Sequence, residues 1–191
     1  FIQIYSINFK ISLILKMVID MQTSLNKFFL FSIFGFLFET FLFSLIGMHN
    51  QSGFLFFWWT PFYGIGVLII EGLYYLMLKK VHHTKKRNFF LFILYFFTLS
   101  LLEFIGGFLL EALHGYRLWS YEMVALHIGK YISIPTSLVW TVFAFLYLYF
   151  VKPFTDRIIK KIPKGITVVL SILFILDLYF TLRKLFIIQI S

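Results

Sequence analysis

The sequence contains no cysteine, which excludes disulfides, thiolate chemistry and metal sites built on thiolates. Charged residues make up only 13% of the 191 residues, and 8 acids stand against 17 lysines and arginines. No G-x-x-x-x-G-K-[ST] loop is present to cradle ATP phosphates, and no G-x-S-x-G elbow is present to carry a serine nucleophile. We therefore expect no bound cofactor, and we favour non-enzymatic functions over an enzyme.

Apolar side chains dominate the chain, at 61% of the residues, and phenylalanine alone occurs 28 times. Soluble domains contain about 45–50% apolar residues, so this composition predicts an integral membrane protein. Apolar runs long enough to cross a bilayer predict spans at residues 28–48, 61–78, 89–113, 132–151 and 165–185. The predicted fold class is all-α, a polytopic bundle of five transmembrane helices.

The second span needs a choice of start, because its apolar run begins at Gly53 and is interrupted by Pro61. Proline is well tolerated in a first helical turn, so the helix is expected to begin at Pro61. Residues 53–60 then form a tryptophan-rich approach that either lies at the membrane interface or dips back into the bundle.

The distribution of lysine and arginine predicts the orientation of the bundle. The segments before span 1, between spans 2 and 3, and between spans 4 and 5 hold three, five and five of these residues, against four on the opposite side. The positive-inside rule then places the N-terminus in the cytoplasm and the C-terminus outside. We interpret the basic runs as topology determinants beside the inner leaflet and expect no nucleic-acid partner.

The predicted organisation is an N-terminal segment (1–26), a five-helix transmembrane domain (27–185) and a short external tail (186–191). Residues 1–16 precede the first methionine, Met17, and are either native or translated upstream sequence.

Five acids lie within the predicted spans: Glu39, Glu71, Glu103, Glu111 and Asp177. An acid at bilayer depth costs roughly 2.5–3.5 kcal/mol on insertion scales. Counting ~1.5 Å per residue places four of them about 12–21 Å from the cytoplasmic ends, near the midplane. The fifth, Glu111, lies closer to the outer interface. Either the four are protonated and join helices by hydrogen bonds, or they line a substrate or proton site, and we predict the second.

The predicted outer loops are rich in aromatic and histidine residues, which form either a routine aromatic belt or a cap folded over the bundle. In the second case Arg117 and Lys130 are candidate countercharges for the acids. Glu111 and His114 share one helical face, but a single such pair does not make a metal centre, so no metal site is predicted.

Several motifs follow one another in a recognisable order. They are Gly53-Phe54-Leu55, Pro61-Phe62-Tyr63-Gly64-Ile65-Gly66, Glu103 with Gly107 and Glu111, Trp119-Ser120-Tyr121-Glu122, His127-Ile128-Gly129-Lys130 and Ser137-Leu138-Val139-Trp140. This order over about residues 27–185 resembles the bacterial ABC-transporter type IV (CmpB-like) membrane proteins. The chain departs from their pattern at Ser120, His127 and Lys130, where the family carries Asp, Asn and Arg.

The resemblance implies a subunit of a transporter in the bacterial cytoplasmic membrane, with a separate ATP-binding subunit as partner. Its motifs add outer-rim candidates to the predicted site: Tyr63, Glu111, Arg117, Trp119, Tyr121, His127 and Lys130. Five helices are few for a complete translocation path, so a homodimer or hetero-oligomer is expected. The alternatives are a membrane-embedded enzyme of lipid or envelope metabolism, with Glu39 or Glu103 as general base, and a non-transporting scaffold.

Overall fold

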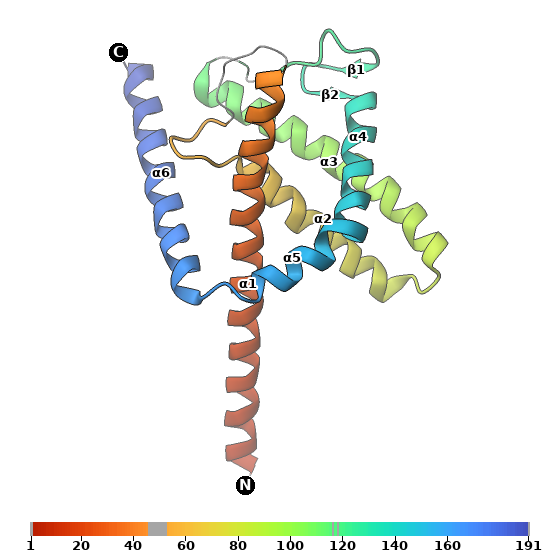
Figure 1. Cartoon of the computed structure of the whole chain (residues 1–191), viewed down its shortest axis with the longest axis vertical. Coiled ribbons are helices and arrows are strands. Elements are labelled where there is room, and N and C mark those ends of the chain that lie inside the picture. Colours follow the sequence, from red (N-terminus) through yellow and green to blue (C-terminus); the bar gives the residue numbers. More distant parts are fainter. Residues whose placement is uncertain (1, 46–52, 116, 118, 191) are drawn as a thin grey trace.

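The computed structural model describes residues 2–45, 53–115, 117 and 119–190. Its elements (Figure 1) are α1 (Ile2–Leu45), α2 (Pro61–Lys80), α3 (Thr84–His114), β1 (His127–Ile128), β2 (Ile132–Ser133), α4 (Ile134–Leu146), the π-helix η1 (Tyr147–Val151), α5 (Lys152–Ile159) and α6 (Lys164–Ile190). Apart from a two-stranded antiparallel hairpin of β1 and β2, the regular structure of the described residues is helical.

Within the described residues, five helices are long and apolar enough to cross a membrane, as the sequence predicts. They cover Asp20–Leu45, Pro61–Lys80, Thr84–Leu113, Ile134–Ile159 and Lys164–Leu185. Several extend beyond the predicted apolar runs, because helical hydrogen bonding continues into the charged flanks. The predicted orientation of the termini across the membrane stays a prediction.

Helix α2 begins at Pro61, as the turn chemistry of proline predicts. The preceding residue, Thr60, has an extended backbone and donates its N–H to the carbonyl of Ser32 in α1, which fixes the entry of the helix. Helix α4 begins after Ser133, whose hydroxyl accepts the N–H of Thr136 as an N-cap.

Helices α1 and α2 approach each other closely because glycines face their contact. A Cβ atom on Gly64 would lie 2.5 Å from the carbonyl oxygen of Phe28, and one on Gly35 would lie 2.3 Å from the ring of Tyr63. Small residues at such contacts allow packing that dispersion forces can stabilise in lipid. The same absence of side chains leaves room for Tyr63 to reach polar groups on α1.

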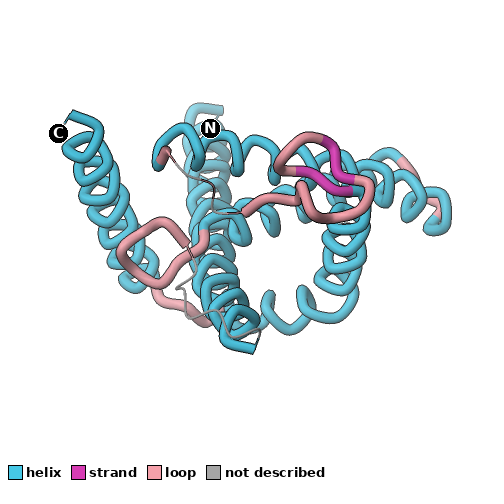
Figure 2. The backbone as a smooth tube through the Cα atoms, turned by 90° about the horizontal axis from the view of Figure 1, so that it is seen from above, coloured by secondary structure: helices cyan, strands magenta, loops and turns pink. Residues whose placement is uncertain are grey.

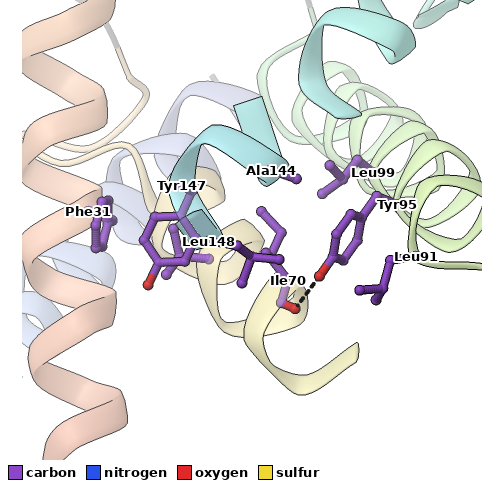
Figure 3. Packing of buried hydrophobic residues seen from close by; sticks show 9 residues of the cluster. Phe31, Ile70, Leu91, Tyr95, Leu99, Ala144, Tyr147 and Leu148 are labelled. Atoms are coloured by element: carbon purple, nitrogen blue, oxygen red, sulfur yellow. Dashed lines mark hydrogen bonds between the residues drawn. The ribbon is translucent and has the colours of Figure 1, made fainter. Parts of the chain in front are cut away.

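The main core lies between α1, α2, α3 and the lower half of α4 with η1. It is built around Phe31, Ile70, Tyr95, Leu99 and Tyr147 (Figure 3). The Tyr95 hydroxyl donates to the carbonyl of Ile70 at 2.9 Å, so this buried polar group is satisfied inside the core.

Helix α6 stands on one side of α1, whereas α2, α3 and α4 extend mainly to the other side (Figure 2). A second apolar cluster joins α1 to α6 through the loop before α2, with Phe29, Leu55 and Trp59 at its centre. Leu55 and Trp59 of this loop are buried between the two helices, whereas Phe56, Phe57 and Trp58 are exposed.

Helix α4 continues through η1 directly into α5, which runs beneath the bundle toward α1 (Figure 1). Pro153 lies at the start of α5, directly after the π-helical turn η1, where the helical hydrogen-bonding pattern already changes.

Candidate functional site

Glu103 of α3 is held on one oxygen and left without a partner on the other. Its Oε1 accepts hydrogen bonds from the Tyr121 hydroxyl at 2.6 Å and from Trp140 Nε1 at 2.7 Å. Its Oε2 is buried and has no hydrogen-bond partner within the described part of the chain. The ion pairs formed by the described residues do not include Glu103.

Two of the predicted acids, Glu39 and Glu103, are connected through aromatic side chains. Tyr63 of α2 donates its hydroxyl to Glu39 of α1 at 3.1 Å. The ring of Tyr63 packs edge-on against Trp140 of α4, with 5.8 Å between centroids, and Trp140 donates to Glu103. We call Glu39, Tyr63, Glu103, Tyr121 and Trp140 the outer polar cluster. It spans four helices and the loop after α3.

Tyr121 reaches the cluster from the loop that carries the β-hairpin. Its N–H donates to the carbonyl of Lys130 at 2.8 Å, which ties Tyr121 to the turn of the β-hairpin. Burial, followed by the neighbouring Glu103 carboxylate, raises the pKa of the Tyr121 hydroxyl above its ordinary value. Tyr121 therefore remains a hydrogen-bond donor at neutral pH. On α3, Gly107 has no side chain, and the ring of Tyr131 packs against its backbone.

The outer rim carries the cations that the sequence offers as countercharges. Arg117 lies 3.3 Å from Glu111 and 2.6 Å from Glu122, and Lys130 lies 3.5 Å from Glu111. The hydrogen bond to Glu111 raises the pKa of Arg117. The hydrogen bond from Ser120 lowers the pKa of Glu122, although burial opposes this effect. These cations thus pair with acids of the rim.

The two remaining rim candidates, His127 and Trp119, lie outside the outer polar cluster. His127 is exposed, and its Nδ1 lies 2.9 Å from the carbonyl oxygen of Gly129 within the hairpin. Trp119 packs edge-on against Phe62, with 6.3 Å between ring centroids, and its buried Nε1 finds no partner within the described residues.

Glu71 lies in a different group, at the lysine-rich end of the bundle. Lys27 Nζ of α1 lies 2.6 and 2.7 Å from its two carboxylate oxygens, and the Tyr147 hydroxyl donates to Oε1 at 2.5 Å. Lys152 lies 4.0 Å from Glu71, and Asp156 binds both lysines, at 2.7 and 2.5 Å. We call these five residues the inner ion network. Its two cations and two acids balance each other.

Sequence reasoning missed this network because it treats Lys27 and Lys152 as surface topology determinants. The signal was present, since Glu71 lies about two turns from the lysine-rich end of its helix. The long aliphatic stem of a lysine at the end of the neighbouring span can carry the ammonium group to that depth. Lys27 is 4% exposed in the structure.

Asp177 of α6 is also fully engaged. It accepts the backbone N–H groups of Phe56 and Phe57 at 2.9 and 3.0 Å, Trp59 Nε1 at 2.7 Å and the Thr181 hydroxyl at 3.3 Å. The carboxylate therefore anchors the loop before α2 to α6. The described side chains of the four predicted acids thus fall into three groups, and only Glu39 and Glu103 share one.

Metal binding has little support in this arrangement. Over the residues that the structure describes, no group of three His, Asp or Glu side chains is placed to hold a metal ion. The His114 side chain, which the sequence pairs with Glu111, lies outside the described side chains.

Comparison with known proteins rests on one family. No curated protein and no solved structure matches the chain. The sequence model of the family described as "Putative ABC-transporter type IV" matches residues 26–182, from the middle of α1 to the upper part of α6. This match covers most of the chain, including the greater part of each of the five candidate membrane helices, so the protein belongs to the Putative ABC-transporter type IV family.

Proposed function

We propose that the protein is the membrane-spanning subunit of an ABC-type transporter, and that the outer polar cluster is its proton or small-cation site. The observation that carries this proposal is the buried Oε2 of Glu103, which has no hydrogen-bond partner among the residues that the structure describes. A buried carboxylate without a compensating charge is costly, so a proton or a bound cation stabilises it. Tyr121 and Trp140 occupy Oε1 and leave Oε2 as the free position.

The contacts of the other three acids explain why the proposed site is placed on Glu103. Glu71 is neutralised by Lys27 and Lys152, and Asp177 accepts four hydrogen bonds. Both are therefore complete within the protein and serve structural roles. Glu39 supports the cluster through Tyr63.

An ATP-binding partner is proposed to dock on α5 and the turn between α2 and α3. Arg157 of α5 and Lys85 and Lys86 of α3 are exposed there. Asp156 of α5 bonds to Lys27, so movement of α5 is transmitted to α1 and α2 through the inner ion network. This link gives a physical route from a cytoplasmic ATPase to the helices that carry the outer polar cluster.

Dicyclohexylcarbodiimide tests the proposed site because it modifies protonated carboxyl groups in apolar surroundings. The purified protein in lipid nanodiscs is treated near neutral pH, and the adducts are mapped by peptide mass spectrometry. We expect an adduct on Glu103, protection by a bound cation if the site takes one, and no adduct on Glu71 or Asp177. Absence of the Glu103 adduct, or equal modification of all three, would overturn the proposal.

The partner is tested by ATPase activity that co-purifies with the tagged protein from its native membranes. Arg157→Glu is expected to reduce this activity. The matched control is Arg183→Glu, an exposed arginine near the opposite end of α6 that should leave the activity unchanged. Equal activity of both variants and the wild type would argue against docking on α5.

A further inference from the structure

An apolar groove of about 400 Å³ runs between α1 and α6 and is separate from the residues of the outer polar cluster. Its walls are formed by Met21, Leu25 and Phe28 of α1, Leu68 of α2, and Phe174 and Ile175 of α6. All of these lie on helices long and apolar enough to cross a membrane. The groove therefore faces hydrocarbon rather than water when the helices span a bilayer.

The two serines that line the groove present no free polar group. The Ser24 hydroxyl donates to the carbonyl of Asp20 at 3.0 Å, and the Ser171 hydroxyl donates to the carbonyl of Thr167 at 2.7 Å. Both bonds stay within their own helices, so the hydroxyls are satisfied without a ligand. The surface left to an occupant is apolar, which suits an acyl chain.

The two ends of the groove differ in character. At the upper end, Phe174 packs edge-on against Phe28 and Trp59, with centroids 5.3 and 5.7 Å away. At the lower end, Gln22 Nε2 donates to the carbonyl of Ile162 at 3.2 Å and ties α1, one residue beyond Met21, to the turn between α5 and α6. Aromatic rings thus lie at the upper end of the lining residues, and the turn between α5 and α6 lies beside the lower end.

The turn at the lower end is strongly basic. Lys160, Lys161 and Lys164 are exposed around Ile162, and Arg157 is exposed one turn earlier. Asp20, also exposed, is the acid nearest in sequence to the lining residues of α1. Cations outnumber the carboxylate, so this end attracts a phosphate headgroup, and each basic residue near a membrane surface adds about 1 kcal/mol of attraction to anionic lipid.

We propose that the groove between α1 and α6 is a binding site for an anionic diacyl phospholipid. One acyl chain fills the groove, and the phosphate headgroup lies on Lys160, Lys161 and Lys164. The volume holds roughly a dozen groups the size of a water molecule, which is enough for much of one chain. The site does not depend on the proposed transport function.

Native mass spectrometry tests the site on the full chain in detergent supplemented with dioleoyl phosphatidylglycerol or dioleoyl phosphatidylcholine. The wild type is expected to retain the anionic lipid about tenfold better than the zwitterionic one. The double variant Lys160→Gln/Lys161→Gln should reduce this preference to near parity. The matched control, Lys85→Gln/Lys86→Gln, makes the same charge change at the start of α3 and should keep the preference.

Location is tested by filling the groove. Ser171→Phe should reduce retention of both lipids, whereas Ile172→Phe, the next residue and exposed on the outside of α6, should not. A phosphatidylglycerol with a diazirine in its acyl chain should label wild-type peptides containing Met21 or Phe174, whether or not the Ser171 variant folds. Equal retention of the two lipids by the wild type, labelling confined to other helices, or labelling from a second copy of the chain overturns the proposal.

Discussion

The inner ion network makes a quantitative prediction for Lys27→Met. The Lys27 and Glu71 side chains are only 6% and 10% exposed, so solvent screens their attraction weakly. Removing one partner of a buried pair costs about 3–5 kcal/mol, because the other charge is left uncompensated. Lys152 remains 4.0 Å from Glu71, where a unit charge still contributes ~4 kcal/mol at an effective dielectric of 20. We therefore expect a loss of about 3 kcal/mol, at the lower end of that range.

The assay is a double-mutant cycle on the free energy of unfolding, measured by SDS titration of the protein in mixed micelles. Lys27→Met and Glu71→Gln are each expected to destabilise the fold. The double variant leaves Lys152 and Asp156 as a balanced pair, so it should recover most of the loss. Lys79→Met changes an exposed lysine at the same end and should stay within about 0.5 kcal/mol. The reasoning is refuted if Lys27→Met costs under 1 kcal/mol, or if the two single losses simply add.

Three further predictions follow from other contacts. Gly64→Ala places a methyl group against a backbone carbonyl of α1 and should cost about 1–3 kcal/mol in the same unfolding assay, whereas Gly72→Ala meets open space and should be neutral or stabilising; equal effects would contradict the packing argument. Asp177→Asn weakens the anchor of the loop before α2, so hydrogen exchange of that loop should accelerate while α3 keeps its protection. The lowered pKa of Glu122 means that its contacts with Ser120 and Arg117 are present above the ordinary carboxyl value of 4.5 and are lost as pH falls through the lower native value; hydrogen exchange of residues 119–122 should rise over that acid window, and Arg117→Gln should reduce the step.

The helices could be predicted from sequence because their cause is local. Apolar runs of spanning length and the preference of proline for a first helical turn are written in consecutive residues, and Pro61 begins α2 as expected. The division of the acids among three groups could not be predicted in this way. It depends on which helices are neighbours and on how far a lysine stem reaches, and neither is a property of one segment.

The outer polar cluster could be predicted from the sequence only in part. Sequence reasoning names Glu39, Glu103, Tyr63 and Tyr121 as candidates, and the structure joins them by hydrogen bonds and ring contacts. The joining residue is Trp140, which appears in the sequence analysis only as part of a motif. Its indole links Tyr63 to Glu103 because α4 packs against α3. Trp140 and Glu103, which share the hydrogen bond, lie 37 residues apart in the chain.

The pairing inside the inner ion network has a consequence for the order of synthesis. Lys27 and Glu71 lie 44 residues apart on consecutive helices, and Lys152 and Asp156 lie one turn apart on another. The α1–α2 hairpin is therefore electrically neutral at this depth before α4 and α5 exist. Helices α4 and α5 follow with the Lys152–Asp156 pair, which is also neutral. Neither half of the network therefore depends on the other to neutralise its charge during synthesis.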